Sequence, residues 1–246
     1  MKKLFLLQVF FLSVFGVCAQ DWRADLEKAR APYRHHAVEI EMEHLFYPSL
    51  TATEPAERQR VWICRNGDKY RVVQYDMEYI CDGNYLVALD TANRLIGIRR
   101  ENRSKPADST SRQQFEQSII DLASSMGLDS IKESDNYTCR YLGESRGQKA
   151  YRFDYRQGEY EYTTVYFSSA TGLLDKTSCV FREPVEVEPG VFNQVRVDFI
   201  YKKQVAGQPF DDKLFSIAAI LSVGANGEPT PTDKYKNYQI INNISK

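Results

Sequence analysis

The sequence predicts a mainly β protein with a few helices, folded as a curved, incomplete antiparallel β-barrel that a helical lid closes. Residues 58–100 and 137–204 each consist of short runs rich in aromatic and β-branched side chains, separated by tight turns. One amphipathic segment precedes these regions and another lies between them. A sheet of about ten strands tends to curl, and we expect the two helical segments to cover its open side.

The first 19 residues have the pattern of a secretory signal peptide. Two lysines form the positive region, residues 4–17 are apolar, and small residues precede a cut after Ala19. The apolar run is too short to favour a permanent membrane span. Cys18 raises the alternative of a lipid anchor, but the three residues before it, FGV, do not fit that signal. We therefore expect residues 20–246 to be exported to the periplasm as a single half-barrel domain.

The composition is that of an ordinary globular protein, with 43% hydrophobic and 26% charged residues. The formal net charge is −1. Removal of Lys2 and Lys3 with the signal peptide takes Lys+Arg from 32 to 30 against Asp+Glu 33, which gives −3. There is no basic stripe in the sequence, so we expect no nucleic acid among the partners.

Residues 21–30 predict a short helix that Asp21 caps and Pro32 limits. Three apolar residues fall on one face of this helix at helical spacing: Trp22, Leu26 and Ala29.

Residues 37–48 alternate between apolar and polar side chains, which predicts a half-buried strand. The apolar face carries Val38, Ile40, Met42 and Phe46, and the other face carries Glu39, Glu41 and Glu43. The alternative is a metal site that uses these glutamates with His35, His36 and His44. However, the glutamates lie along one straight edge and His44 falls on the opposite face, so we expect a solvated outer face.

The region from residue 58 to residue 100 predicts an up-and-down antiparallel meander. Its strongest signals are Asn66-Gly67 and Asp82-Gly83, because tight hairpin turns require positive φ at their central residues. Acidic corners at Asp76 and Asp90 separate the remaining runs.

Residues 111–127 predict an amphipathic helix that begins at Ser111 and ends at Gly127. Because the helix lies between two β regions, its apolar stripe must cover a sheet face or an opening. The stripe consists of Phe115, Ile119, Leu122, Ala123 and Met126.

A second meander follows, with strands predicted over residues 137–144, 149–156, 160–169, 173–183 and 191–204. Residues 184–190 are expected to form a loop. In the tail, residues 215–223 fit either an edge strand or a buried helical turn. Residues 224–233 are rich in turn residues, and residues 234–244 fit a last strand.

Four cysteines remain after the predicted cut: Cys64, Cys81, Cys139 and Cys179. Four cysteines allow three pairings, and the sequence does not choose among them. Bridges within a meander, Cys64–Cys81 and Cys139–Cys179, are geometrically the easiest. The alternative is four small buried apolar side chains, since a chain of this size does not need covalent staples. No CxxC pair occurs, so neither thiol redox chemistry nor a zinc site is expected.

The sequence gives no positive support for catalysis. It contains no G-x-S-x-G, H-E-x-x-H or phosphate-loop motif, and its histidines lie within residues 35–44. Asp154 and Glu161 lie on neighbouring predicted strands, but two carboxylates on the wet face of a sheet explain them better than a catalytic pair. We expect a protein that is not an enzyme and uses no cofactor or metal.

Several local motifs, in this order of elements, resemble the LolA-like family of periplasmic carriers for outer-membrane lipoproteins. Residues 61–65 (VWICR), followed by 69–72 (KYRV), resemble the family's strand that ends in arginine and is followed by an aromatic residue. Residues 79–90 (YICDGNYLVALD) resemble its Asp-Gly hairpin, and residues 167–176 (FSSATGLLDK) its strand, turn and glycine. Residues 196–201 fit a late strand. The chain departs from the family at Asn66, where proline is usual, at a tyrosine where phenylalanine is usual, and in the tail beyond residue 223.

The resemblance implies an apolar concave side that holds the acyl chains of a lipid or lipoprotein, with helices as a lid. Carried over by motif, Arg65 is the strand-end arginine that pairs with the lid backbone, and Tyr70 is the aromatic that helps to close the cavity. The remaining expected groove and lid residues are Ile40, Met42, Phe46, Phe115, Ile119 and Leu122. The expected partners are acyl chains and membrane-associated donor and acceptor proteins, with the chain as a monomer. The alternating faces fit equally well a non-catalytic envelope sensor or scaffold that binds a partner protein, if side chains fill the barrel.

Overall fold

The computed structural model describes residues 22–34, 37–101 and 136–244. Strands dominate these ranges, and within them the one α-helix is α2 (Trp22–Arg30), which runs into the 3-10 turn η1 (Ala31–Arg34). The predicted N-terminal helix is therefore confirmed from Trp22 onward. The predicted signal peptide and central helix, together with His35 and His36, lie outside the described residues. No described helix has the length and apolar character needed to span a membrane.

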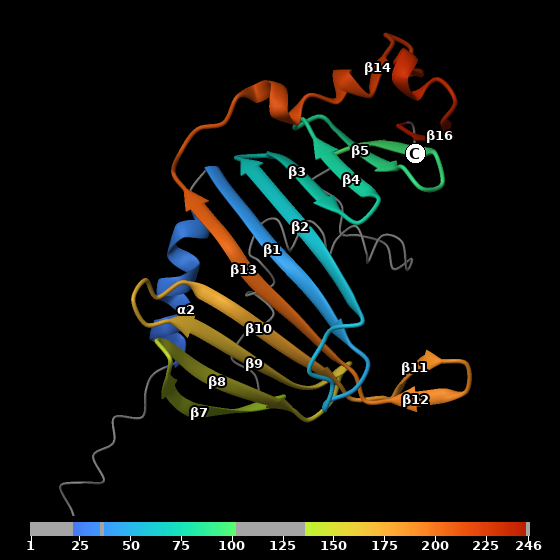
Figure 1. The fold of residues 1–246 in the computed structure, drawn as a ribbon. Coiled ribbons are helices and arrows are strands. Elements are labelled where there is room, and N and C mark those ends of the chain that lie inside the picture. Colours follow the sequence, from blue (N-terminus) through green and yellow to red (C-terminus); the bar gives the residue numbers. More distant parts are fainter. Residues whose placement is uncertain (1–21, 35–36, 102–135, 245–246) are drawn as a thin grey trace, which may run out of the picture.

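Twelve strands form one sheet in the order β16-β6-β5-β4-β3-β2-β1-β13-β10-β9-β8-β7, and their direction rotates progressively along it (Figure 1). The sheet is not closed into a barrel, since β16 and β7 are its two edges. The strands are β1 (Ala37–Tyr47), β2 (Glu57–Asn66), β3 (Lys69–Gln74), β4 (Met77–Cys81), β5 (Tyr85–Asp90), β6 (Leu95–Arg100), β7 (Tyr137–Ser145), β8 (Gln148–Tyr155), β9 (Tyr160–Ser168), β10 (Leu174–Phe181), β13 (Arg196–Ala206) and β16 (Gln239–Asn243).

Both predicted meanders are confirmed, and the pairing of β1 with β13 joins them into one sheet. Strands β2 to β6 pair in sequence order. Gly67 and Gly83 have φ of 64° and 96°, as their turns require. The Asp82 carboxylate accepts hydrogen bonds at 2.8 Å from the backbone N–H groups of Asn84 and Tyr85, which fixes that corner.

Residues 184–190 form a strand and a turn, where the sequence predicts a loop. Strands β11 (Val185–Glu188) and β12 (Val191–Asn193) form a two-stranded sheet of their own between β10 and β13. Gly190 has φ of 76° at the turn, and its N–H donates to Glu186 Oε1 at 2.7 Å. The strand predicted over residues 191–204 is therefore split, because its first residues pair back on β11.

The C-terminal tail crosses β4, β5 and β6 on the face away from α2. It contains η3 (Asp212–Phe215), η4 (Ile217–Ala219), β14 (Leu221–Val223), β15 (Pro229–Pro231) and η5 (Asp233–Tyr235), and it ends with β16 parallel to β6. Residues 215–223, which the sequence left between strand and helical turn, contain both. The tail buries a second apolar cluster against the sheet: Ile80, Val87, Leu89, Ile96, Ile98, Ile217, Ile220, Leu221 and Tyr235.

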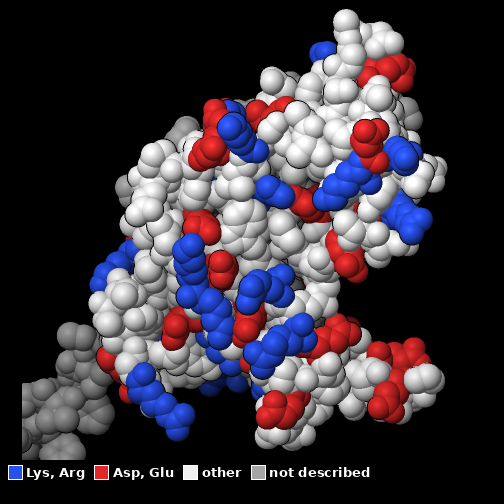
Figure 2. Space-filling view, turned by 45° about the horizontal axis from the view of Figure 1, so that its top comes forward, with Lys and Arg blue, Asp and Glu red and all other residues white. Residues whose placement is uncertain are grey.

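The sheet has two different faces. The helix face, defined here as the side that packs on α2, carries Ile40 of β1, Ile63 of β2, Val72 of β3 and Val165 of β9. The opposite face carries charged residues over the central strands, where Lys and Arg alternate with Asp and Glu (Figure 2). There Glu39 accepts hydrogen bonds from Lys203 at 2.7 Å and from Trp62 at 3.1 Å. The glutamates of β1 thus lie on an outer face, as predicted.

The four described cysteines are free thiols, so the two predicted disulfides are corrected. Cys64 lies opposite Arg71 and Cys81 lies opposite Tyr70, which places the two thiols on either side of β3 and on opposite faces. Cys139 and Cys179 are separated by β8 and β9. Neighbouring strands are about 4.8 Å apart, so both Cα separations exceed the roughly 7 Å that a disulfide allows.

Candidate binding site

The helix face is the candidate binding site, because one apolar cluster on it joins strands of both meanders to α2. Its aliphatic part lies on β1, β2 and β3, where Ile63 and Val72 have no exposed surface. Its aromatic part lies on β7, β8 and β9 next to the start of α2. In this part the Trp22 ring packs edge-on against Phe153 at 5.3 Å and against Tyr137 at 6.1 Å. The buried cluster therefore has a long aliphatic region with an aromatic wall at one end.

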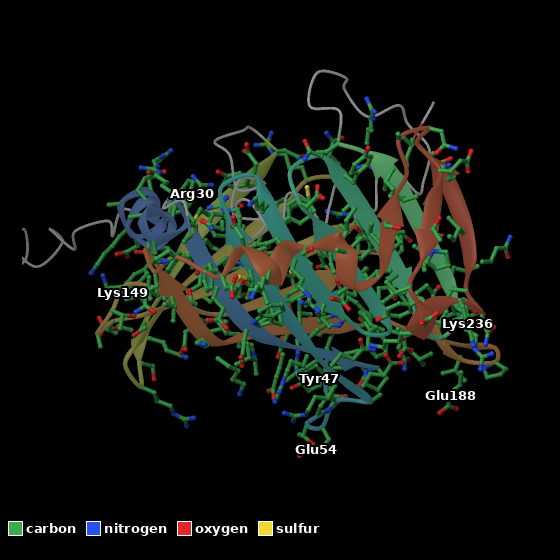
Figure 3. The ribbon with its side chains drawn as sticks, turned by 90° about the horizontal axis from the view of Figure 1, so that it is seen from above. Arg30, Tyr47, Glu54, Lys149, Glu188 and Lys236 are labelled. Atoms are coloured by element: carbon green, nitrogen blue, oxygen red, sulfur yellow. The ribbon has the colours of Figure 1, made fainter. Side chains whose placement is uncertain are left out.

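Helix α2 lies along one end of this face, and Figure 3 shows it end-on at one corner of the sheet. Its residues are mostly good helix formers, and its buried side chains, Leu26 and Ala29, are three positions apart and thus on one side of the helix. The helix end is close to the β9–β10 turn, since a side chain added at Gly172 would collide with the Lys28 side chain. Packing alone thus gives α2 one defined orientation on the sheet.

A carboxylate holds α2 to β8. Asp25, whose side chain is 17% exposed, accepts a hydrogen bond from the Tyr151 hydroxyl at 2.6 Å and from the Lys149 ammonium at 3.1 Å. Tyr151 is almost fully buried, and burial together with the nearby Asp25 carboxylate raises the pKa of its hydroxyl. The hydroxyl therefore stays protonated and serves as a hydrogen-bond donor to the helix.

A second tie holds η1, which follows α2, to β2, β13 and β10. The Arg65 guanidinium donates to the backbone carbonyl of Tyr33, and the Tyr33 hydroxyl donates to Gln204 Oε1. The Gln204 amide in turn donates to the Leu174 carbonyl at 2.6 Å. Burial lowers the pKa of Arg65 and raises the pKa of Tyr33. This chain of hydrogen bonds connects the end of the helical segment to strands from both meanders.

The structure brings together four of the residues predicted for the site. Ile40 and Met42, each 1% exposed, and Tyr70, 8% exposed, belong to the apolar cluster, and Tyr70 lies directly opposite Arg65 in the β2–β3 pair. Phe46 is only partly buried near the end of β1. There the buried positions change to Leu45 and Tyr47, beyond a register shift in the β1–β13 pairing at Glu41/Met42. The predicted Phe115, Ile119 and Leu122 lie outside the described residues.

The sequence analysis missed Asp25, Tyr33 and Gln204, which make the polar ties. Asp25 was the one residue of the three with a sequence signal, because it is acidic and lies in the first turn of a short amphipathic helix. A carboxylate at that position is also explained by local stabilisation of the helix, so it did not indicate a contact with the sheet. Tyr33 and Gln204 are 171 positions apart, and no local pattern relates them.

Asp154 and His44, which the sequence raised as possible catalytic or metal-binding residues, have partners within the sheet. No described group of His, Cys, Asp and Glu side chains is placed to hold a metal ion. The Asp154 carboxylate pairs with Arg140 and Arg152 opposite Tyr162, so the neighbouring Glu161 lies on the other face. His44 accepts or donates a hydrogen bond at 2.8 Å with Tyr75 and stacks on Phe199 at 5.1 Å.

No family model matches the chain, and a comparison with curated proteins finds no match. Among solved structures, an uncharacterized conserved protein from Thermus thermophilus is 9% identical, with a TM-score of 0.45, 90% of this chain covered and 99% of that one. A LolA superfamily protein from Nitrosomonas europaea is 10% identical, with a TM-score of 0.31 and coverage of 79% and 96%. The MucA/MucB complex of Pseudomonas aeruginosa gives 13% identity, a TM-score of 0.40 and coverage of 84% and 62%. These likenesses are low in both identity and TM-score, so the function follows from the chain's own residues.

Proposed function

We propose that the chain is an exported periplasmic carrier that binds the acyl chains of a lipid or lipoprotein on its helix face, without catalysing a reaction. The observation that carries this proposal is the single apolar cluster that extends from β4 and β5 to β8 and includes one side of α2. A surface of this length matches an extended hydrocarbon chain better than a compact polar ligand. The signal-peptide pattern supports export, and membrane-associated donor and acceptor proteins would then load and unload a monomeric carrier.

The size of the hydrophobic effect decides whether such a face can hold a lipid without polar contacts. Each buried methylene contributes about 0.8 kcal/mol, so about ten methylenes contribute roughly 8 kcal/mol. A charge-assisted hydrogen bond such as that of Arg65 contributes about 1.5–3 kcal/mol. An acyl chain therefore gains more from the face than α2 and η1 gain from either polar tie. To displace this segment, the acyl chain must also replace the apolar contacts of Leu26, Ala29 and Tyr33.

Bound lipid and its dependence on Arg65 test the proposal. Protein purified from the cell envelope is analysed by native mass spectrometry and lipid extraction, and uptake of a fluorescent fatty acid is measured on delipidated protein. We expect a bound acyl species and saturable uptake. Recovery of no acyl species together with no uptake would refute the carrier function.

The variant Arg65→Leu removes the tie to Tyr33 and is expected to change the release rate of the fluorescent fatty acid more than it changes the free energy of unfolding. Arg60→Leu is the matched control, because Arg60 is an exposed residue of the same strand on the opposite face. A loss of stability in Arg65→Leu without a change in release would show that the tie is purely structural.

The second candidate function is a non-catalytic envelope sensor or scaffold that binds a partner protein. The observation that favours it is the complete burial of Ile63, Val72 and Val165 at the centre of the helix face, which is what a filled interior produces. Fluorescent fatty-acid uptake separates the two functions, since a filled interior takes up no probe at any concentration.

A further inference from the structure

We propose that the hairpin β11–β12 and the neighbouring β1–β2 loop form a docking surface for a protein that presents an apolar site surrounded by Lys and Arg. This surface lies apart from the helix face, and the proposal stands whether or not that face binds lipid. The hairpin, residues 183–195, projects from the body of the molecule at the end of the sheet (Figure 1). The loop, residues 48–57, emerges beside it, because the last residue of β1, Tyr47, pairs with the first residue of β13, Arg196.

Large apolar side chains gather at this end of the sheet without being buried. Phe192 is 61% exposed, Val191 is 43% exposed, and Leu50 of the loop is 38% exposed. Phe192 and Val191 lie next to the turn of the hairpin, and because they are exposed they contribute nothing to a core. An isolated two-stranded hairpin is only marginally stable in water. Aromatic side chains exposed on a projecting element are typical anchors of protein interfaces.

The hairpin and the loop carry charge of one sign. The hairpin contains Glu183, Glu186 and Glu188 and no Lys or Arg. The loop, counted here up to Glu57 at the start of β2, contains Glu54 and Glu57 and again no Lys or Arg. Glu186 lies directly opposite Phe192 across the hairpin, so carboxylate and ring share one face. Figure 3 shows Glu188 directed away from the body of the molecule, and Figure 2 shows the acidic side chains on the projecting lobe.

The bases that flank this surface have partners of their own. Arg58 contacts Glu43 at 3.1 Å, and Arg196 contacts Asp198 at 3.3 Å and lies over the Tyr47 ring. Arg182 turns back toward the sheet and donates to the backbone carbonyls of Tyr155, Gly158 and Tyr160 at 2.8, 3.1 and 3.2 Å. A partner with a basic rim would complement the carboxylates and accept Phe192 at its centre. An anionic membrane surface would repel them, which favours a protein over a lipid bilayer as the occupant.

The first experiment measures binding of the full chain to synthetic amphipathic peptides with the same leucine and phenylalanine content but with lysine, serine or glutamate at the polar positions. We expect a preference of about tenfold or more for the lysine peptide, which decreases as ionic strength rises. Phe192→Ser and the double variant Glu186→Lys, Glu188→Lys should each lose this preference. Leu142→Ser is the matched control, because Leu142 is 53% exposed on β7, an edge strand that β8 and β9 separate from β10, and it should bind as the wild type does.

The second experiment places a photo-crosslinking amino acid at position 192 in intact cells. The expected result is one discrete protein adduct that disappears in the Glu186→Lys, Glu188→Lys background, while a crosslinker at position 142 gives no such adduct. Equal binding of all three peptides, or variants that bind as well as the wild type, would overturn the proposal. So would binding to phosphatidylglycerol vesicles that depends on Phe192, or self-association that the charge reversal abolishes, since these would identify a membrane or a second copy as the occupant.

Fatty-acid uptake by Phe192→Ser separates this proposal from the proposed carrier function. Uptake is expected to be unchanged, because Phe192 lies outside the helix face. In Phe192→Ser, loss of peptide binding with retained uptake supports the docking surface independently of the carrier function. Wild-type protein that binds the lysine peptide but takes up no fatty acid refutes the carrier function and leaves the docking surface standing.

Discussion

The attachment of α2 to β8 gives a prediction whose size follows from the structure. Asp25→Ala leaves the buried Tyr151 hydroxyl without its acceptor, at a cost of about 1–3 kcal/mol. The Lys149 ammonium is 24% exposed and can be solvated by water, so its ion pair adds only about 0.5–1 kcal/mol. We therefore expect the free energy of local opening of α2 to fall by about 2 kcal/mol. The amide hydrogens of α2 should then exchange about 30-fold faster, since 1.4 kcal/mol corresponds to a factor of ten.

A double-mutant cycle separates the hydrogen bond from other effects of the substitution. Tyr151→Phe removes the hydroxyl and leaves Asp25 paired with Lys149, so the cycle should give a coupling free energy of about 1–2 kcal/mol. The control is Glu27→Ala on the same helix, where the carboxylate is 50% exposed and its partners are Arg30 and Arg34; hydrogen exchange should change less than about threefold. Two results would refute this account of how the helix is held. One is an exchange rate of the α2 amides in Asp25→Ala within twofold of the wild type, and the other is the same effect of Asp25→Ala in the Tyr151→Phe background.

Four further predictions concern the stability of the sheet. Asp198 is 1% exposed and contacts Lys176 Nζ at 2.6 Å and Ser178 Oγ at 2.6 Å. Asp198→Ala should therefore lower the free energy of unfolding, measured in urea, by about 3 kcal/mol. A loss below about 1 kcal/mol would contradict a buried network. Burial raises the pKa of Cys64 to about 12 and that of Cys179 to about 11, so both should resist iodoacetamide at about pH 8 in the native protein and react in urea; a thiol that reacts only after reduction would instead reveal a disulfide. Deletion of residues 209–246 should uncover Ile96 and Ile98 and cause binding of a hydrophobic dye, and an unchanged dye signal would show that the tail is not their cover. The hydrogen bond from Lys203 keeps the pKa of Glu39 below its ordinary value of 4.5. Its contribution to stability is therefore complete above about pH 4.5 and is lost as the pH falls through the lowered pKa. Glu39→Gln should make the free energy of unfolding less dependent on pH in this acid range, and an unchanged dependence would assign it to other carboxylates.

Local patterns predicted the strands because the sequence signal for each strand lies within a few consecutive residues. The turns at Asn66-Gly67 and Asp82-Gly83 have the positive φ at glycine that their sequences require, and the strands beside them pair as expected. The alternation of residues 38–42 correctly separated the helix face from the charged face. Alternation of apolar and polar residues is thus sufficient to assign side chains to a face wherever one side of a strand is apolar and the other is exposed to solvent.

The features that the sequence did not predict depend on partners that are distant in the chain. The union of the two meanders depends on the pairing of β1 with β13 across more than half of the chain, and no local signal specifies it. The disulfide prediction was wrong because proximity within a meander says nothing about strand order or about which face a side chain occupies. Strand β11 was predicted as part of a loop and β12 as the start of a longer strand, because these strands have 4 and 3 residues, a length at which periodicity is hard to recognise.

The face opposite the helix face has different environments on β4 to β6 and on the central strands. On the central strands, ion pairs such as those of Glu39 and Asp198 keep the opposite face polar. On β4 to β6 the same face is apolar, and the tail buries Ile80 and Ile98 there. The tail thus covers β4 to β6 on the face that the central strands expose to water. The other side of β4 and β5 belongs to the apolar cluster of the helix face through Tyr79 and Leu86. Strands β4 and β5 are therefore apolar on both sides, because the C-terminal tail covers one side and the helix face continues along the other.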